Sequence, residues 1–279
     1  MTSPGLFRAD LLLRQSGATG PVLGLETGSP QASLAICSHG RILASEAPAR
    51  RAHGESVAGA IDAMLRRCGL RVGDLAAIAV GIGPGSFTGL RIALSYAKGV
   101  ALATGCALIG VPSLDALALC AAELDGVPAD AVLCPLLDAR KQEVYAALYR
   151  QVENGLEKIS GEFLAKPMDL VRQIEGAAVF IGDGAAAWGA WLEEHLGCER
   201  ALLASLEGAP LSAAMIAAAG AARLAGGSTD AIASLQPLYV RPSEAELKAK
   251  CPANDAGLEA LWSREKKSSS ASTQTTIRN

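Results

Sequence analysis

Clustered basic residues, paired cysteines and long apolar runs are all missing from this sequence of 279 residues. Its formal net charge is −3, whereas a protein that grips RNA alone needs clustered Lys and Arg to displace counterions. No apolar run approaches the ~20 residues of a membrane-spanning helix. The cysteines show neither a CxxC pair nor a disulfide-like spacing: Cys37, Cys68, Cys106, Cys120, Cys134, Cys198 and Cys251. We therefore expect a cytoplasmic protein in a reducing compartment, with no membrane contact and no autonomous RNA binding.

The two ends of the chain differ from the rest. Leu11, Leu12 and Leu13 are mixed with charged residues, which is not the uninterrupted apolar stretch of a signal peptide. We expect residues 1–20 to form a loose N-terminal extension. The segment 266–273 is rich in Lys and Ser and has no apolar periodicity with which to offset ordering entropy. Residues 246–279 are therefore expected to be a largely disordered tail.

The chain between the two ends predicts one order of elements twice. Apolar runs, turn residues and helical periodicity predict strands at 22–26, 32–37 and 41–46, a helix at 54–68, a strand at 76–81 and a helix from about 88. A similar order follows, with strands at 131–137, 143–149 and about 156–164, a helix from 167, a strand at 178–182 and a helix from 186. Such a repeat suggests gene duplication. We expect an α/β protein of two tandem ribonuclease-H-like lobes, 21–112 and 113–245, in the actin-like ATPase (ASKHA) architecture.

The most informative stretch runs from Gly81 to Arg91, between an apolar strand and a helix. Gly83 and Gly85 permit positive φ, and Ser86 or Thr88 can cap the helix. A glycine loop at a helix N-terminus could also hold an anion. A P-loop would need Lys followed by Ser or Thr, but Leu90 and Arg91 stand there. The glycines also miss the spacing of a dinucleotide fingerprint, which leaves a tight loop that caps and docks a helix.

This stretch closely resembles the signature of the TsaB (YeaZ) family, and the resemblance spans about 22–245. It is carried by Gly83, Pro84, Gly85, Ser86, Phe87, Thr88, Gly89 and Arg91, with supporting segments at 25–27, 53–55, 110–117, 138–145 and 237–241. Glu26 stands where the family commonly has Asp, and Gly54 where it commonly has Ser. The resemblance implies a non-catalytic scaffold in forming threonylcarbamoyl on the tRNA adenosine beside the anticodon. Its partners would be the catalytic paralogue TsaD and the P-loop ATPase TsaE, with tRNA contacted only within the complex.

A site of the chain's own is not expected. His39, His53 and His195 are too far apart to form the helical His-x-x-x-His pair that holds metal in the catalytic paralogue. Weak candidates for a nucleotide site are the hairpin residues Glu26 and Thr27 and the turn residues Gly182 and Asp183, although a cap and a turn are the commoner roles. We therefore predict no catalytic residue, metal or cofactor. The alternatives are an actin-like ATPase or phosphotransferase and a glycopeptidase-like metalloprotease.

The two helices of the first lobe have more apolar surface than one sheet can cover. In helix 88–104 one stripe holds Gly89, Ala93, Ala97 and Ala101 with Leu90 and Leu94, and another holds Ile92, Tyr96, Gly99 and Ala103. Helix 54–68 has the small residues Ser56, Gly59 and Ala63 behind its core stripe. The second stripes either pack these two helices together or bind another molecule. The resemblance favours binding to TsaD, with a homodimer through the same face when TsaD is absent.

Overall fold

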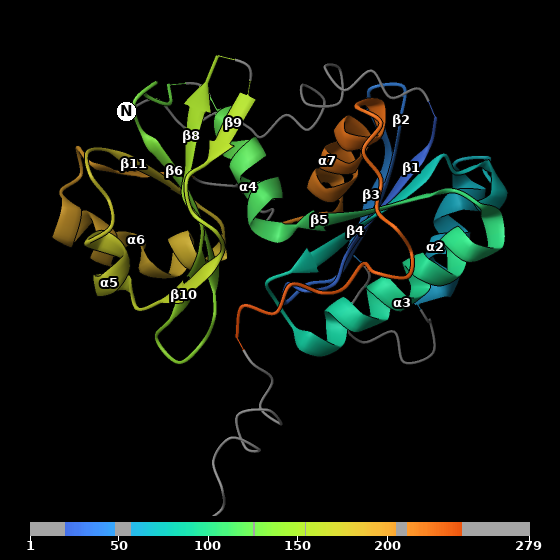
Figure 1. The fold of residues 1–279 in the computed structure, drawn as a ribbon, viewed down its shortest axis with the longest axis horizontal. Helices are drawn as coiled ribbons and strands as arrows, with labels where there is room; N and C mark the ends of the chain where they lie inside the picture. The colour runs from blue at the N-terminus through green and yellow to red at the C-terminus, as the bar shows by residue number, and fades with distance from the viewer. Residues whose placement is uncertain (1–19, 48–56, 125, 154, 205–210, 242–279) are drawn as a thin grey trace, which may run out of the picture. The chain divides into compact units, whose positions relative to one another are not determined.

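The computed structural model describes residues 20–47, 57–124, 126–153, 155–204 and 211–241, which form two β-sheets with helices against them (Figure 1). The predicted extension 1–20, except Gly20, and the predicted tail 246–279 lie outside the described residues. In the described part, no helix is both long and apolar enough to cross a bilayer.

The first sheet has the strand order β3-β2-β1-β4-β5. Its elements are β1 Val22–Glu26, β2 Ser33–Ser38, β3 Arg41–Glu46, α2 Val57–Arg67, a 3-10 turn η1 Val72–Asp74, β4 Ala77–Gly83, α3 Phe87–Thr104 and β5 Ala107–Pro112. β1, β2 and β3 are antiparallel, whereas β4 and β5 run parallel to β1. Every residue of β1 and β2 is buried, which explains why the sequences inside these strands, Val22–Leu25 and Leu34–Cys37, are continuous apolar runs rather than alternating ones.

The second sheet repeats this order as β10-β7-β6-β11-β12. The elements that follow β5 in the chain are α4 Ser113–Ala122, β6 Val132–Asp138, β7 Val144–Ala146, β8 Tyr149–Val152, β9 Gly155–Lys158, β10 Phe163–Ala165, α5 Pro167–Val171, β11 Ala178–Ile181, α6 Asp183–Leu196, β12 Ala201–Leu203 and α7 Ala213–Ala225. The first three strands of the path are again antiparallel neighbours, and β11 and β12 again run parallel to β6. The predicted repeat of one element order and the two ribonuclease-H-like lobes of the actin-like architecture are therefore confirmed.

The predicted strands 143–149 and 156–164 are each split in two, because a β8–β9 hairpin is inserted that the first sheet does not have. β6 pairs with β7 through Leu136–Asp138 and with β8 through Val132–Leu133. The break lies at Pro135 and its neighbour, and a proline has no N–H to donate to a ladder. The split was missed because β7 and β8 are separated by only two apolar residues, Ala147 and Leu148.

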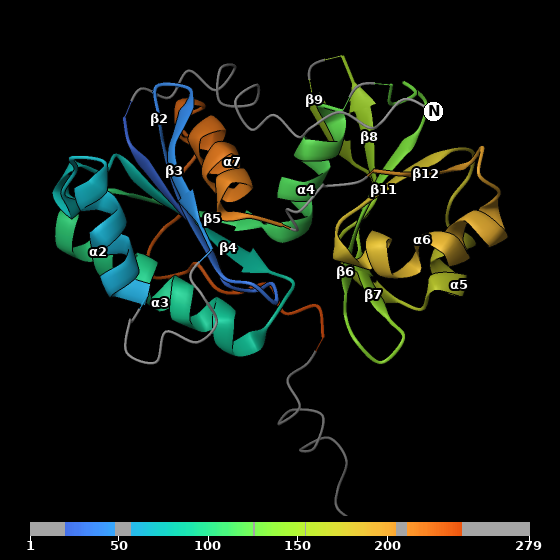
Figure 2. The same ribbon diagram turned by 180° about the vertical axis from the view of Figure 1, so that it is seen from behind.

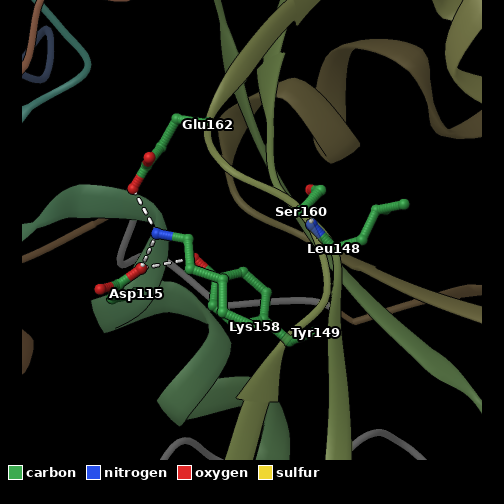
Figure 3. A network of polar contacts seen from close by, with 6 residues as sticks. All are labelled: Asp115, Leu148, Tyr149, Lys158, Ser160 and Glu162. Atoms are coloured by element: carbon green, nitrogen blue, oxygen red, sulfur yellow. Dashed lines mark hydrogen bonds and ion pairs between the residues drawn. The ribbon is translucent and has the colours of Figure 1, made fainter.

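A polar network ties the inserted hairpin to α4 (Figure 3). The Tyr149 hydroxyl donates to Asp115 Oδ1 at 2.5 Å, and Lys158 Nζ donates to the same oxygen at 2.7 Å. Lys158 also pairs with Glu162. Burial, followed by the Asp115 charge, raises the pKa of Tyr149. This phenol therefore stays protonated at neutral pH and acts as a hydrogen-bond donor.

The helix α7 was not predicted, and it packs against the first sheet although it follows the second one in the sequence (Figure 1). Small residues allow this close approach: a Cβ on Gly24 would lie 2.3 Å from the Ala213 carbonyl oxygen, and one on Gly220 would lie 2.4 Å from Ala79 Cβ. α4 and α7 contact each other between the two sheets and share one apolar core. The lobe boundaries 21–112 and 113–245 stay a prediction, because residues 20–240 form a single compact unit.

Candidate functional site

The glycine-rich stretch forms the short connection between β4 and α3. Gly83 has a φ of 104°, in the region that favours glycine, and the Gly83–Pro84 peptide bond is cis. Of the two predicted cap residues, Ser86 and Thr88, it is Ser86 that caps α3: its hydroxyl oxygen accepts from the Gly89 N–H at 3.4 Å. The loop therefore sets the direction in which α3 leaves the sheet.

This loop docks tightly onto the turn between β1 and β2. The Ser86 N–H donates to the Gly28 carbonyl at 2.7 Å, and the Thr27 hydroxyl donates to the Gly89 carbonyl at 2.7 Å. A Cβ on Gly85 would lie 2.6 Å from the Gly28 oxygen. Glycine is required here because two backbones meet, and the Ser86 N–H is already used by a protein carbonyl.

Replacing Gly89 by alanine tests this docking. In an open helix the change would stabilise the chain by up to about 1 kcal/mol. Here the new Cβ would lie 1.9 Å from the Thr27 carbonyl oxygen, so we expect a net loss of about 2 kcal/mol of unfolding free energy in urea titrations. The matched control is Gly99→Ala on the same helix, where nothing lies within 4 Å of the new Cβ. Equal stability of the two variants would contradict the docking role.

Glu26 is fully buried behind this turn. Its Oε1 accepts from the N–H groups of Gly28 at 2.6 Å and Ser29 at 3.0 Å. Burial raises its pKa to about 7 against the opposing effect of these two bonds. Its Oε2 has no hydrogen-bond partner among the described residues and points at Gly81, where a Cβ would lie 2.2 Å away. Glu26 thus caps the turn, which is a commoner role for such a residue than nucleotide binding.

A cavity of about 390 Å³ lies between the two sheets, beside the turn and the glycine loop. It is lined by Gly28, Ser29, Pro30, Pro84, Gly85, Ser86, Leu137, Asp138, Ala139, Arg140, Tyr145, Asp183 and Leu211. Of the four nucleotide candidates, only Asp183 lines it, and neither Glu26 nor Thr27 does. The one Lys or Arg side chain in this lining, Arg140, lies 3.5 Å from Asp138 Oδ2. Two carboxyl groups against one paired cation are a poor fit to the phosphates of a nucleotide.

Gly182 and Asp183 hold the second lobe's turn together. A Cβ on Gly182 would lie 2.2 Å from the Leu136 carbonyl oxygen. Asp183 Oδ1 accepts from the Asp138 N–H at 3.0 Å, and burial raises the Asp183 pKa. The helix predicted from Ala186 begins at Asp183, because an acidic residue is favourable in the first turn and interacts with the helix dipole.

The two predicted stripes of α3 differ in their exposure to solvent. The stripe with Ala93 and Ala97 is buried against the sheet, whereas Ile92 is 50% exposed and Gly99 and Ala103 are exposed. Leu102, which belongs to neither predicted stripe, is 72% exposed. Because an ideal helix turns ~100° per residue, Leu102 lies with Ile92, Gly99 and Ala103 within one arc of roughly 100° around the α3 axis.

The two helices α2 and α3 lie side by side on one face of the first sheet (Figure 2). Their core residues, such as Ile61 and Met64 of α2, join Ala93 and Ala97 in one cluster. Gly59 is exposed, whereas Ala63 and Tyr96 are half-buried. Burial, and then the Asp62 charge, raise the pKa of Tyr96. The predicted face therefore contains exposed Gly59, Ile92, Gly99 and Ala103 with Ala63 and Tyr96 at its edge, while Ser56 lies outside the described residues.

Comparison with known proteins places this arrangement in a family. A family model described as "TsaD: tRNA N6-adenosine threonylcarbamoyltransferase" matches residues 46–247. The tRNA threonylcarbamoyladenosine biosynthesis protein TsaB of Escherichia coli (strain K12) is 33% identical over 233 residues, which cover 79% of this chain and 94% of that protein. This chain belongs to the TsaB family. TsaB of Bacillus subtilis (strain 168) is 26% identical over 180 residues, covering 63% of this chain and 76% of that protein. The structure titled YeaZ from Pseudomonas aeruginosa matches with a TM-score of 0.62 and 26% identity, covering 79% of this chain and all of that one.

The histidines of this TsaB-family chain lie apart from one another. His39 is in the β2–β3 turn with a φ of 48°, and its Nδ1 lies 2.8 Å from the Ser38 hydroxyl. His195 stacks on Trp191 at the end of α6, with ring centroids 3.7 Å apart, and His53 lies outside the described residues. Within the described part of the chain, no three or more His, Cys, Asp or Glu side chains gather where they could hold a metal ion.

Proposed function

We propose that this TsaB-family chain is a non-catalytic scaffold for forming the threonylcarbamoyl group on N6 of the tRNA adenosine beside the anticodon. It binds and supports the catalytic subunit TsaD and helps to recruit the ATPase TsaE in the cytoplasm. The observation that carries the proposal is the apolar outer face of α3, with Ile92 and Leu102 exposed to solvent. Family membership supports the choice of reaction, because the relatives are named for threonylcarbamoyladenosine biosynthesis.

The outer face of α3 has the properties of a helix-packing surface. Gly99 and Ala103 follow Ile92 on nearly the same side and let another helix approach closely. Burying each large exposed side chain of the face contributes roughly 1.5–3 kcal/mol. This chain matches the TsaD family model over residues 46–247. TsaD should therefore have a related lobe with similar helices, and that lobe is a suitable partner for the α3 face. Without TsaD, the same face pairs two copies of this chain.

A scaffold role also agrees with the charge of the chain. A net charge of −3 gives no strong attraction to the tRNA backbone, so tRNA is contacted within the complex. An ATPase would need a cavity that receives phosphates, whereas the two carboxylates of Asp138 and Asp183 line the cavity beside the glycine loop.

Reconstitution of the modification reaction tests the proposal. TsaD, TsaE, the threonylcarbamoyl donor, ATP and unmodified tRNA are incubated with and without this chain, and the modified nucleoside is measured by mass spectrometry. We expect modification only when the chain is present, and no ATP hydrolysis above background by the chain alone. Full modification without the chain would overturn the scaffold role, and ATP hydrolysis by the chain alone would favour the ATPase alternative.

A further inference from the structure

Arg91 is held in place at the N-terminal end of the α3 face. Its Cζ lies 4.1 Å from the centroid of the Phe87 ring, and its Nε donates to the Tyr239 hydroxyl at 2.9 Å. The rings of Phe87 and Tyr239 stack with centroids 5.0 Å apart. The segment that carries Tyr239 is fixed in turn, because the Leu238 N–H donates to the Ile82 carbonyl at 2.7 Å.

The cluster of Arg91, Phe87 and Tyr239 is held together by its own contacts, but part of its surface is not covered by the chain. Phe87 and Tyr239 are 39% and 42% exposed, although both are aromatic. Among the described residues, the Nη atoms of Arg91 have no hydrogen-bond or ion-pair partner. Exposed aromatic and arginine side chains are typical of the residues that contribute most to protein interfaces. Because contacts with Phe87 and Tyr239 already hold the guanidinium, binding costs little further side-chain entropy.

We propose that Arg91 receives a carboxylate of TsaD, in a bidentate ion pair at one end of the apolar α3 face. The planar guanidinium fork matches the two oxygens of a carboxylate, and the two Nη groups are the donors still available. Arg91 lies three turns before Leu102, on the same edge of the helix. This proposal rests on the proposed function, since it assigns a specific contact to the same partner.

A protein carboxylate is a better partner for Arg91 than an RNA phosphate. Arg91 and Lys98 are the only cationic side chains of α3, and the whole chain has a net charge of −3. Binding of nucleic acid relies on several cations that together displace counterions. A single ordered arginine beside apolar side chains is instead typical of a protein interface.

Affinity measurements with TsaD test the contact. We expect Arg91→Ala to weaken binding roughly 10- to 100-fold, because the partner's carboxylate then loses its ion pair. Arg91→Lys keeps the charge but loses the fork and the stacking, so we expect a loss of about tenfold. Tyr239→Phe removes only the acceptor that orients Arg91, and we expect a loss of about threefold. The control is Arg172→Ala, at the C-terminal cap of α5. Arg172 is exposed and pairs with Asp169, and this variant should bind as the wild type does.

Cross-linking identifies the group that Arg91 contacts. In the complex made with Arg91→Lys, a carbodiimide condenses the new amine with an adjacent carboxylate, and mass spectrometry locates the amide. A link to an Asp or Glu of TsaD supports the proposal. If TsaD binds the wild type and its affinity for Arg91→Ala is within twofold of the wild-type affinity, the proposed contact is wrong and the proposed function stands. Unchanged TsaD affinity with weaker tRNA binding by the complex would also overturn it, in favour of a phosphate contact.

Discussion

Replacing Gly99 by aspartate should abolish binding to TsaD while leaving the chain folded. A Cβ at this position meets nothing within 4 Å, so the variant has room for the new side chain in the isolated protein. In the complex, the carboxylate would be buried at a helix crossing where small residues allow close approach. An uncompensated buried charge costs several kcal/mol, and we expect at least a 100-fold loss of affinity in titration calorimetry.

The control for this variant is Gly161→Asp, in the loop between β9 and β10. This glycine also has nothing within 4 Å of its would-be Cβ, so the two variants carry the same new charge at equally open positions. Both should unfold at temperatures close to that of the wild type. Binding of Gly99→Asp at wild-type affinity would show that the outer face of α3 is not the interface.

Local patterns predicted most strands because their chemistry is local. The run Val22–Glu26 is buried throughout, and the turn residues after it end the strand where expected. The predicted strand 41–46 has the observed bounds, Arg41–Glu46. The position of α7 could not be predicted in this way. Its alanine-rich sequence fits many apolar surfaces. Its choice of the first sheet depends on Gly24 lying against Ala213 and Gly220 lying against Ala79, in pairs 189 and 141 positions apart in the chain.

The candidate site divides in a similar way. Helical periodicity separates the stripe of Ala93 and Ala97 from that of Ile92 and Gly99, but it cannot say which of two apolar stripes faces the sheet. The contact between Arg91 and Tyr239 joins residues 148 positions apart, and no local pattern reports such a pairing. Leu102 was missed because a leucine in an apolar helix is ordinarily assigned to the core.

Glu26 should lower the free energy of unfolding of the chain as the pH rises. Burial raises its pKa from 4.5 to about 7 in the folded chain, so the folded state keeps this proton after the unfolded state has released it. Between these two pH values the unfolded state binds fewer protons, and unfolding becomes easier as the pH increases. At about 1.4 kcal/mol per pH unit, the loss amounts to about 3 kcal/mol by pH 7 and then levels off.

Glu26→Gln isolates this contribution, because the amide resembles the protonated acid and cannot ionise. Its oxygen can accept from the Gly28 and Ser29 N–H groups as Glu26 Oε1 does. Urea unfolding from pH 4.5 to 8 should show the variant gaining about 3 kcal/mol relative to the wild type across that range. The matched control is Glu157→Gln, which changes a half-exposed carboxylate of β9 and should show no such gain. Parallel pH profiles for Glu26→Gln and the wild type would mean that Glu26 is ionised in the folded chain. In that case Oε2 carries its charge beside Gly81 and needs a donor that the described residues do not supply.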